Sequence, residues 1–174
     1  KERVQDVSGG ESLPIKESLK AIKGNRPWIA VLLLGIVFFM LYIMKVSAGI
    51  YYLTYNINKP EIISTVNTLS MCSLVGILAV PFLSKKFSKV LLINTGIAIN
   101  IVGQLIILMA GANVSMIIAG TIIGSIGMGL PAGLLFTLMA DTVDYGEWKS
   151  GVRAQGIIVS AAGIGIKFGS GLGG

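Results

Sequence analysis

Histidine is absent from this sequence, and cysteine occurs only once, as Cys72 inside an apolar run. Without histidine the chain lacks the commonest general base, metal ligand and physiological pH switch. A single cysteine builds neither a disulfide framework nor a zinc site. The sequence also lacks a nucleophile elbow, a phosphate-binding glycine loop and paired metal ligands. We therefore expect a protein that is not an enzyme and that holds no metal or other cofactor.

Charged residues are scarce as well, at 13% of the 174 residues, whereas 53% are hydrophobic. Soluble domains carry about a quarter charged residues. The net charge of +6 does not indicate a nucleic-acid partner, because that interpretation needs a basic face on a soluble module. The composition predicts an all-α membrane protein, a polytopic helical bundle in which lipid surrounds most side chains.

Five apolar stretches are long enough to cross a bilayer, for which a helix needs about 20 residues. Tryptophan and tyrosine at the two ends of the first stretch are typical of membrane interfaces. The connections at 56–61, 84–89, 111–113 and 141–151 are short, so successive spans are expected to be antiparallel neighbours. We expect the last span to be truncated. The predicted spans are about 28–55, 62–83, 90–110, 114–140 and 152–174.

Lysine and arginine are distributed unevenly about these spans. Of the 14, eleven lie in residues 1–27, in the connection 84–89, or in and just beyond the connection 141–151 (Lys149 and Arg153), and only Lys59 lies in a connection on the opposite side. Basic connections stay on the inner side of a membrane. We therefore expect a multi-pass protein of the inner (cytoplasmic) membrane with residues 1–27 in the cytoplasm.

Residues 1–27 start as a polar segment and then predict a short amphipathic helix. Such a helix lies on a membrane surface with its lysines at anionic headgroups, or it is a solvated linker. Both interpretations remain open. The apolar stripe consists of Ile15, Leu19 and Ile22, and the lysine stripe beside it of Lys16, Lys20 and Lys23.

Two lysines lie inside predicted spans, where a cation costs about 3 kcal/mol or more and needs compensation. Lys45 lies toward the outer end of the first span, so it either snorkels to the interface or faces a polar group. Lys167 lies among the glycines of the last span. We expect Lys167 to face a polar cavity or a carboxylate.

The acidic residues of the membrane part gather at the cytoplasmic end of the fourth span, at three-residue spacing: Asp141, Asp144 and Glu147. Lys149 and Arg153 follow just beyond. If the helix continues to about residue 148, the three carboxylates lie along one stripe. They then either pair with cations of another helix, in ion pairs that break and re-form during transport, or only anchor a helix end at the interface.

Glycines recur at near four-residue spacing in the last two spans, which favours close helix packing. The segment Gly129–Pro131 also frees backbone groups in mid-span, which is tolerated where neighbours or a water-filled cavity satisfy them. The fourth span is therefore either tightly packed or a bent, moving helix. The glycines are Gly120, Gly124, Gly127, Gly129 and Gly133, followed by Gly156, Gly163, Gly165, Gly169 and Gly171.

The segment Ala140–Gly156 (ADTVDYGEWKSGVRAQG) resembles the signature of the glycoside-pentoside-hexuronide:cation symporter family. The segments at 25–28 (NRPW), 51–55 (YYLTY) and 167–169 (KFG) are similar to the same family. This family belongs to the major facilitator superfamily, whose two six-helix halves rock around a central site. The resemblance implies that the spans are helices seven to eleven of a partial C-terminal half, that residues 1–27 are the middle loop, and that the last helix and the N-terminal half are missing.

Melibiose-permease-like members of the family imply roles for individual residues. Lys167 matches a lysine near cation-binding aspartates of the first half, so we expect it to take part in substrate or cation coupling, with Lys45 as a second candidate. The site for Na+ or H+ is expected mainly in the missing N-terminal half. Those members also stack a tryptophan of helix ten on the sugar, whereas this chain has Ala132 at about that height. The implied cytoplasmic gate consists of Asp141, Asp144, Tyr145, Glu147, Lys149 and Arg153.

The resemblance predicts secondary active symport of a glycoside, pentoside or hexuronide with Na+ or H+ by alternating access. The expected partners are a small-molecule sugar, membrane lipid and the N-terminal half of the same transporter, with no nucleic acid. The chain by itself is expected to be inactive. Two alternatives stay open, namely transport of a lipid or another amphiphile on the same scaffold, and a membrane sensor or scaffold that transports nothing.

Overall fold

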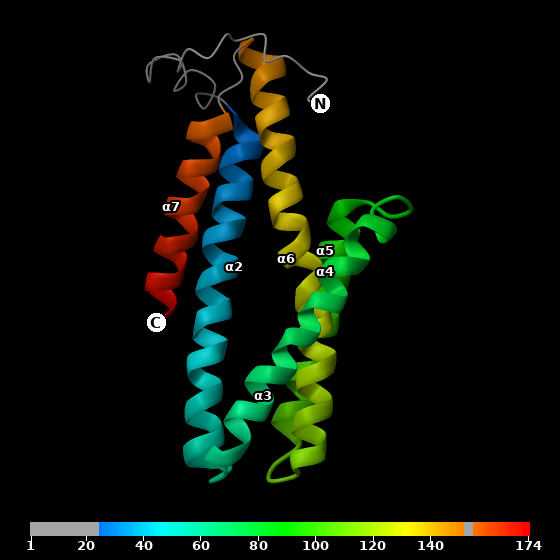
Figure 1. Cartoon of the computed structure of the whole chain (residues 1–174), viewed down its shortest axis with the longest axis vertical. Coiled ribbons are helices and arrows are strands. Elements are labelled where there is room, and N and C mark those ends of the chain that lie inside the picture. Colours follow the sequence, from blue (N-terminus) through cyan, green and yellow to red (C-terminus); the bar gives the residue numbers. More distant parts are fainter. Residues whose placement is uncertain (1–24, 152–154) are drawn as a thin grey trace, which may run out of the picture.

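A computed structural model of the chain describes residues 25–151 and 155–174. The regular structure in these residues is helical throughout, and four helical stretches are long and apolar enough to cross a membrane (Figure 1). The all-α fold class is therefore confirmed. The amphipathic helix expected before residue 24 and the gate candidate Arg153 lie outside the described residues.

The first membrane-spanning stretch consists of helix α2 (Arg26–Tyr51) and one π-helical turn, η1 (Tyr52–Asn56). Asn25 caps α2, because its side chain accepts a hydrogen bond from the Trp28 N–H at 3.0 Å. A proline in the first turn suits this position, which requires no N–H donor. With 31 residues the stretch exceeds the length that a bilayer needs.

The second stretch is divided into four short segments, η2 (Pro60–Ile62), α3 (Ile63–Leu69), η3 (Ser70–Cys72) and α4 (Ser73–Leu83). The turns η2 and η3 are 3-10 helical, and a 3-10 turn within a longer helix tightens its winding locally. Figure 1 shows that this stretch starts beside the end of α2 and crosses toward α6. The second stretch therefore connects the end of α2 with the part of the molecule that contains α6.

Helices α5 (Lys89–Met109) and α6 (Val114–Ser150) form the third and fourth stretches. The predicted connection at 141–151 is helical over its first ten residues, because α6 continues to Ser150 and ends at Gly151, whose φ of 69° is left-handed. The limits of the membrane span stay a prediction. Polar and charged side chains do not break a helix, whereas a left-handed glycine ends one. The ten residues beyond position 140 lengthen the helix by roughly 15 Å.

Helix α6 packs closely against both α4 and α5 through glycine contacts. A Cβ atom on Gly129 of α6 would lie 2.8 Å from the Gly76 Cα of α4, far inside van der Waals contact. A Cβ on Gly103 of α5 would lie 2.5 Å from the Gly124 Cα of α6. These contacts support the tight-packing interpretation of the glycines. Bending or movement of α6 stays a prediction.

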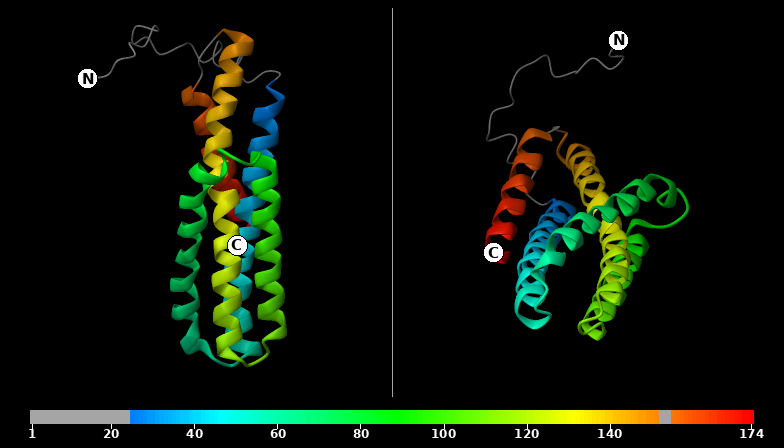
Figure 2. Two further views of the ribbon diagram at one scale, coloured as in Figure 1. Left: turned by 90° about the vertical axis from the view of Figure 1, so that its right-hand side faces the viewer. Right: turned by 60° about the horizontal axis from the view of Figure 1, so that its bottom comes forward.

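Helix α7 (Gln155–Gly173) lies against α2, as the views in Figure 2 show. A Cβ on Gly169 would overlap the Ile36 carbonyl, and one on Gly165 would lie 2.6 Å from the Leu32 side chain. The apolar part of α7, Ile158–Gly173, is shorter than the other four stretches, so its crossing of a membrane stays a prediction. An apolar cluster joins α2, α6 and α7, with Leu135, Met139 and Ala162 buried against Phe38 and Ile166.

Candidate functional site

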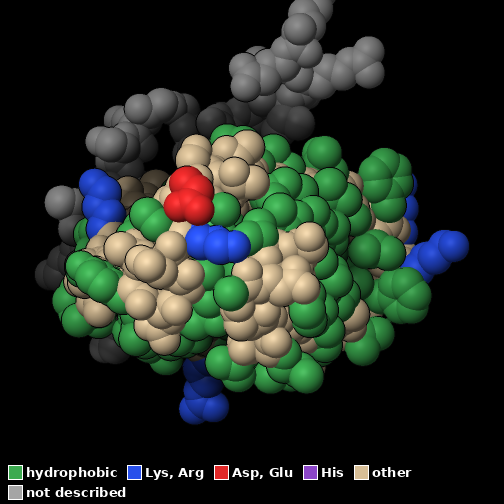
Figure 3. All heavy atoms as spheres, turned by 90° about the horizontal axis from the view of Figure 1, so that it is seen from below, with side chains coloured by type: hydrophobic (Ala, Val, Ile, Leu, Met, Phe, Trp, Pro, Cys, Tyr) green, Lys and Arg blue, Asp and Glu red, His purple; other side chains and the backbone are tan. Residues whose placement is uncertain are grey.

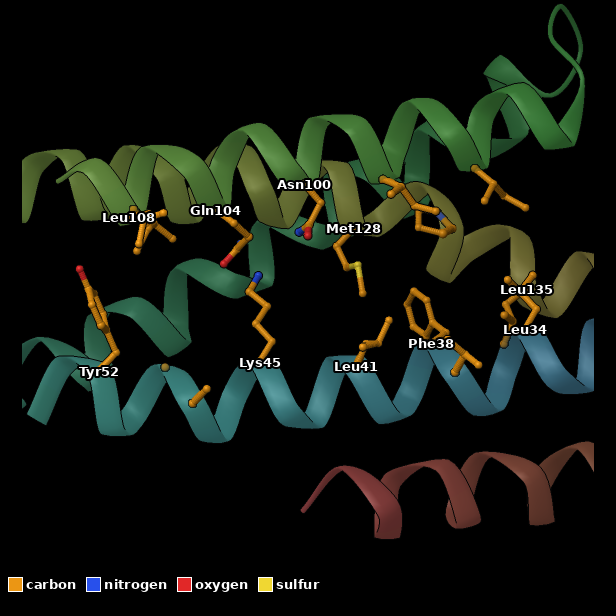
Figure 4. Close-up of a pocket in the computed structure, with 17 residues that line it drawn as sticks. Leu34, Phe38, Leu41, Lys45, Tyr52, Asn100, Gln104, Leu108, Met128 and Leu135 are labelled. Atoms are coloured by element: carbon orange, nitrogen blue, oxygen red, sulfur yellow. The ribbon is translucent and has the colours of Figure 1, made fainter. Parts of the chain in front are cut away.

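Three cavities of about 580, 280 and 100 Å³ lie beside the second half of α2, and Lys45 is the only described residue that lines all three. In Figure 4 the Lys45 side chain points from α2 across toward α5, and not along α2 toward its end. Of the two interpretations of Lys45, this orientation supports the polar-cavity one over snorkelling. Among the described residues, Lys45 makes no hydrogen bond or ion pair.

No acidic residue of the described part lines these cavities. All of them lie outside the predicted spans, in the first turn of a helical stretch or in the last ten residues of α6, far along the chain from the middle of a span. The positive charge of Lys45 is therefore not neutralised by this part of the protein. The acidic residues in question are Glu61, Asp141, Asp144 and Glu147.

The cavity of about 280 Å³, here called the polar cavity, lies between α2, the region from α3 to α4, and α6. Val46 and Met128 provide its apolar wall. The remaining lining residues carry hydroxyl, amide or ammonium groups, which both donate and accept hydrogen bonds between them. They are Tyr42, Lys45, Asn67, Ser70, Ser73 and Ser125.

Ser125 of α6 is the most enclosed of these polar residues, with 3% of its surface exposed. Its hydroxyl makes no hydrogen bond with the residues that the structure describes. The close approach of Gly76 and Gly129 brings α4 onto α6 and so places Ser73 and Ser125 at the same cavity. The polar cavity therefore presents unused hydrogen-bonding groups to a hydroxylated ligand.

The cavity of about 580 Å³, here called the large cavity, lies between α2, α5 and α6 and is lined mainly by aliphatic side chains (Figure 4). Its polar exceptions are Lys45, Tyr52, Asn100 and Gln104. Asn100 donates a hydrogen bond to the Gly124 carbonyl at 2.7 Å, whereas the Gln104 Nε2 is buried with no hydrogen-bond partner. In Figure 4 Gln104 points toward Lys45.

The polar residues Tyr42, Ser125, Asn100 and Gln104 were not among the predicted site residues. A signal was present for two of them, since Asn100 and Gln104 are four residues apart and so share one face of an apolar span. For Tyr42 and Ser125 the sequence shows no pattern, because single hydroxyl side chains are common in membrane helices.

The structure does not bring Lys167 together with Lys45. Lys167 is exposed on α7 and lines none of the three cavities. Helix α7 lies on the other side of α2 from the residues that line the large cavity (Figure 4). Within the described chain, Lys167 therefore does not face the cavity or carboxylate expected from the sequence, and its role in coupling stays a prediction.

The predicted gate residues cluster at one end of α6. Lys89, at the start of α5, forms an ion pair with Asp141, so at least one carboxylate pairs with a cation of another helix. The rings of Tyr145 and Trp148 are in contact, with centroids 5.8 Å apart. Further contacts engage Asp144, Glu147 and Lys149.

At the same end, residues 25–28, which the sequence marked only by their similarity to the family, form hydrogen bonds between helices. The buried Asn25 side chain donates a hydrogen bond to the Thr142 carbonyl of α6 at 3.0 Å while it caps α2. The Trp28 indole donates to the Ile158 carbonyl of α7 at 3.5 Å. Residues 25–28 thus join the ends of α2, α6 and α7.

The opposite end of the molecule is largely hydrophobic and carries few charged side chains (Figure 3). There the Lys59 ammonium donates to the Ala112 carbonyl at 3.4 Å, which places the connection after α2 beside the connection after α5. The described connections therefore alternate between two ends, as expected for antiparallel spans.

Comparison with known proteins identifies the family. A model of the family described as MFS/sugar transport protein matches residues 1–174. The chain belongs to this family. This match confirms the resemblance to the glycoside-pentoside-hexuronide symporters and the partial major facilitator fold. Members of the MFS/sugar transport family are membrane transporters and not enzymes.

Several curated proteins of this kind are similar to the chain. The isoprimeverose transporter of Lactiplantibacillus pentosus is 40% identical, over 100% of this chain and 37% of the relative. The uncharacterized symporter YnaJ of Bacillus subtilis is 30% identical, over 100% of this chain and 38% of the relative. The glucuronide carrier protein homolog of Escherichia coli is 28% identical over the same shares. The chain thus spans little more than a third of the length of these relatives.

Proposed function

We propose that the full-length protein containing this chain is a secondary active symporter, which carries a glycoside, pentoside or hexuronide together with Na+ or H+ by alternating access. The observation that carries this proposal is the polar cavity beside Lys45, enclosed by the membrane-spanning helices of a chain from the sugar transport family. Substrate sites of such transporters lie near the middle of the membrane between moving helices.

The chemistry of the polar cavity suits a sugar. Sugar hydroxyl groups both donate and accept hydrogen bonds, and the Ser73 and Ser125 hydroxyls and the Asn67 amide do the same. The Tyr42 ring and the Met128 side chain offer surfaces for the apolar face of a sugar ring. The volume, about 280 Å³, fits a small ligand.

The names of the relatives support the choice of substrate and coupling. The relative that is 40% identical is named for transport of isoprimeverose, and another is named as a glucuronide carrier homolog. The Bacillus subtilis relative is named as a symporter. We carry these properties over as the proposed substrate class and the proposed coupling to a cation.

The contacts at the end of α6 suit a cytoplasmic gate. The Lys89–Asp141 ion pair is partly exposed, so it can break and re-form at small cost when the helix ends separate. We place this end in the cytoplasm because eleven of the 14 basic residues flank it. The protein is accordingly proposed for the inner membrane, with residues 1–27 on the cytoplasmic side.

Lys167 is proposed to act in coupling. It is exposed on α7, on a surface that no described helix covers. A lysine within the membrane needs a polar or charged partner. The proposed partner is a carboxylate of the N-terminal half, where the Na+ or H+ site is expected.

A second candidate function is transport of a lipid or another amphiphile. The large cavity favours it, because its volume is about 580 Å³ and its lining is mainly aliphatic, with Phe38 and Tyr52 as the only aromatic residues. Such a lining gives few hydrogen bonds to a sugar and a favourable surface to an acyl chain.

Ligand-dependent thermal stability of the purified full-length protein tests these proposals. At least one sugar of a panel of glycosides, pentosides and uronides should raise the unfolding temperature, because a ligand that binds only the folded state stabilises it. Ser125→Ala should weaken this sugar response. Ser115→Ala, at an exposed site of the same helix, should leave the response unchanged. Stabilisation by lipids with no response to any sugar would favour the amphiphile transporter and contradict the sugar transporter.

A further inference from the structure

We infer that the polar cavity selects sugars that carry a negative charge, as a carboxylate or a sulfonate, over neutral sugars, and that Lys45 is the residue that recognises this charge. The inference rests on the proposed sugar transport and narrows its substrate class. It assigns Lys45 to the substrate and not to the coupling cation.

The positive charge of Lys45 has no negative partner among the described residues that line the cavities. Lys45 is the only charged residue among the described residues that line the three cavities, and the four acidic residues of the described part lie in the first turn of a helical stretch or in the last ten residues of α6. An ammonium group held away from bulk water is unfavourable unless an anion accompanies it. A neutral sugar leaves this charge uncompensated, whereas an anionic sugar neutralises it on binding.

Several hydrogen-bond donors line the polar cavity together with Lys45. A carboxylate or sulfonate only accepts hydrogen bonds, so it needs several donors. The hydroxyls of Ser73 and Ser125 and the Asn67 amide line the same cavity, and none of them makes a hydrogen bond with the described residues. Ser125 has 3% of its surface exposed, and its hydroxyl is available to donate to a ligand in the cavity. No carboxylate of the described residues lines the cavity to compete for these donors.

The ammonium group of Lys45 is directed into the helix bundle (Figure 4). Lys45 points across the helix bundle toward Gln104, which is a neutral amide (Figure 4). Lys45 makes no hydrogen bond or ion pair with the described residues. Its ammonium group therefore lies within the helix bundle with its positive charge available to a ligand.

Binding of matched sugar pairs to the purified full-length protein tests the inference. The probes are methyl glucuronide against methyl glucoside and methyl galacturonide against methyl galactoside, since the members of each pair differ only at C6. In at least one pair the wild-type protein should bind the acid roughly tenfold or more tightly, because a close charge pair away from water contributes strongly to binding. Isothermal titration calorimetry measures both affinities directly.

Three variants complete the experiment. Lys45→Met should remove the preference for the acid, and it should fold well because it takes a charge out of the membrane. Lys45→Arg should keep the preference, because the charge remains. Lys59→Met removes an equal charge at the end of the molecule, where Lys59 bonds the Ala112 carbonyl, and should leave both affinities unchanged.

Equal binding of acid and neutral sugars to the wild-type protein would overturn the inference, and so would a preference that persists in Lys45→Met. Equal weakening of both sugars in Lys45→Met would also overturn it, because Lys45 would then pair with a carboxylate of the protein. Binding and uptake of neutral sugars without preference would leave the proposed symport intact. Absence of binding by every sugar would overturn both proposals.

Discussion

The Lys89 ammonium at the start of α5 pairs with the Asp141 carboxylate of α6, so the connection after α4 and the last turns of α6 lie at the same end of the molecule. The two side chains are 35% and 50% exposed. An exposed ion pair contributes only about 0–1 kcal/mol to the free energy of unfolding. The ion pair therefore matters less for stability than for holding the start of α5 beside the last turns of α6.

Asp141→Asn should lower the unfolding free energy by less than about 1 kcal/mol. It should nevertheless reduce sugar uptake by the full-length transporter several-fold, because the gate loses an ion pair that favours one conformation. Uptake into cells at equal protein level measures this effect. The double variant Lys89→Asp with Asp141→Lys should restore part of the uptake, and Lys85→Met, at an exposed site nearby, should have no effect. Normal uptake by Asp141→Asn would contradict the gate.

Gly129→Ala should destabilise the protein by about 1–3 kcal/mol, because the added methyl group has no room between α4 and α6. Gly163→Ala is the matched control, since a Cβ there meets no atom within 4 Å. This control should be neutral or slightly stabilising, because alanine favours a helix over glycine. Thermal unfolding of the two variants in detergent makes the comparison. Equal effects at the two positions would contradict the close packing.

Asn25→Ala should cost more stability than Asn113→Ala, although both residues cap a helix. Loss of a cap costs about 1 kcal/mol in each case. Asn25 is fully buried and also donates to the Thr142 carbonyl, so its loss removes a hydrogen bond between α2 and α6 as well, which adds about 1 kcal/mol to the cost. Asn113 caps α6 at an exposed position. Chemical unfolding of both variants tests the difference, and equal costs would show that the hydrogen bond to α6 adds nothing.

Cysteine labelling tests the arrangement of the connections. In a background with Cys72→Ala, cysteines placed at Lys86 and Gly151 should react with a membrane-impermeant reagent only from the cytoplasmic side. A cysteine at Ala112 should react only from the outer side, because the Lys59–Ala112 contact lies at the opposite end from Lys89–Asp141. Labelling of positions 86 and 151 from opposite sides would contradict the topology.

Much of the fold was predictable because an apolar stretch of about 20 residues or more predicts a membrane-spanning helix. The starts and ends of α2 and α5 lie within a few residues of the prediction. Helix α6 continues ten residues beyond the predicted end of the fourth span, because hydropathy marks the limit of the lipid and not the limit of the helix. In water, a helix continues until a residue such as Gly151 ends it.

The candidate site was less predictable than the fold. Lys45 stood out because a charge inside a span is costly, and the structure places it in the lining of all three cavities. Ser125 and Ser73 meet only because Gly76 and Gly129 let α4 approach α6. A single sequence does not show which faces of two helices come together. Lys167 stood out for the same reason as Lys45, but its expected partner is not among the described residues.

Uptake driven by a cation gradient tests the proposed symport most directly. In vesicles that contain the full-length protein, an inward gradient of Na+ or H+ should raise sugar uptake several-fold above the uptake without a gradient. Lys167→Ala should lower the gradient-driven part at unchanged protein level, because the proposed coupling depends on its charge. Sugar uptake that is the same with and without either gradient would contradict symport.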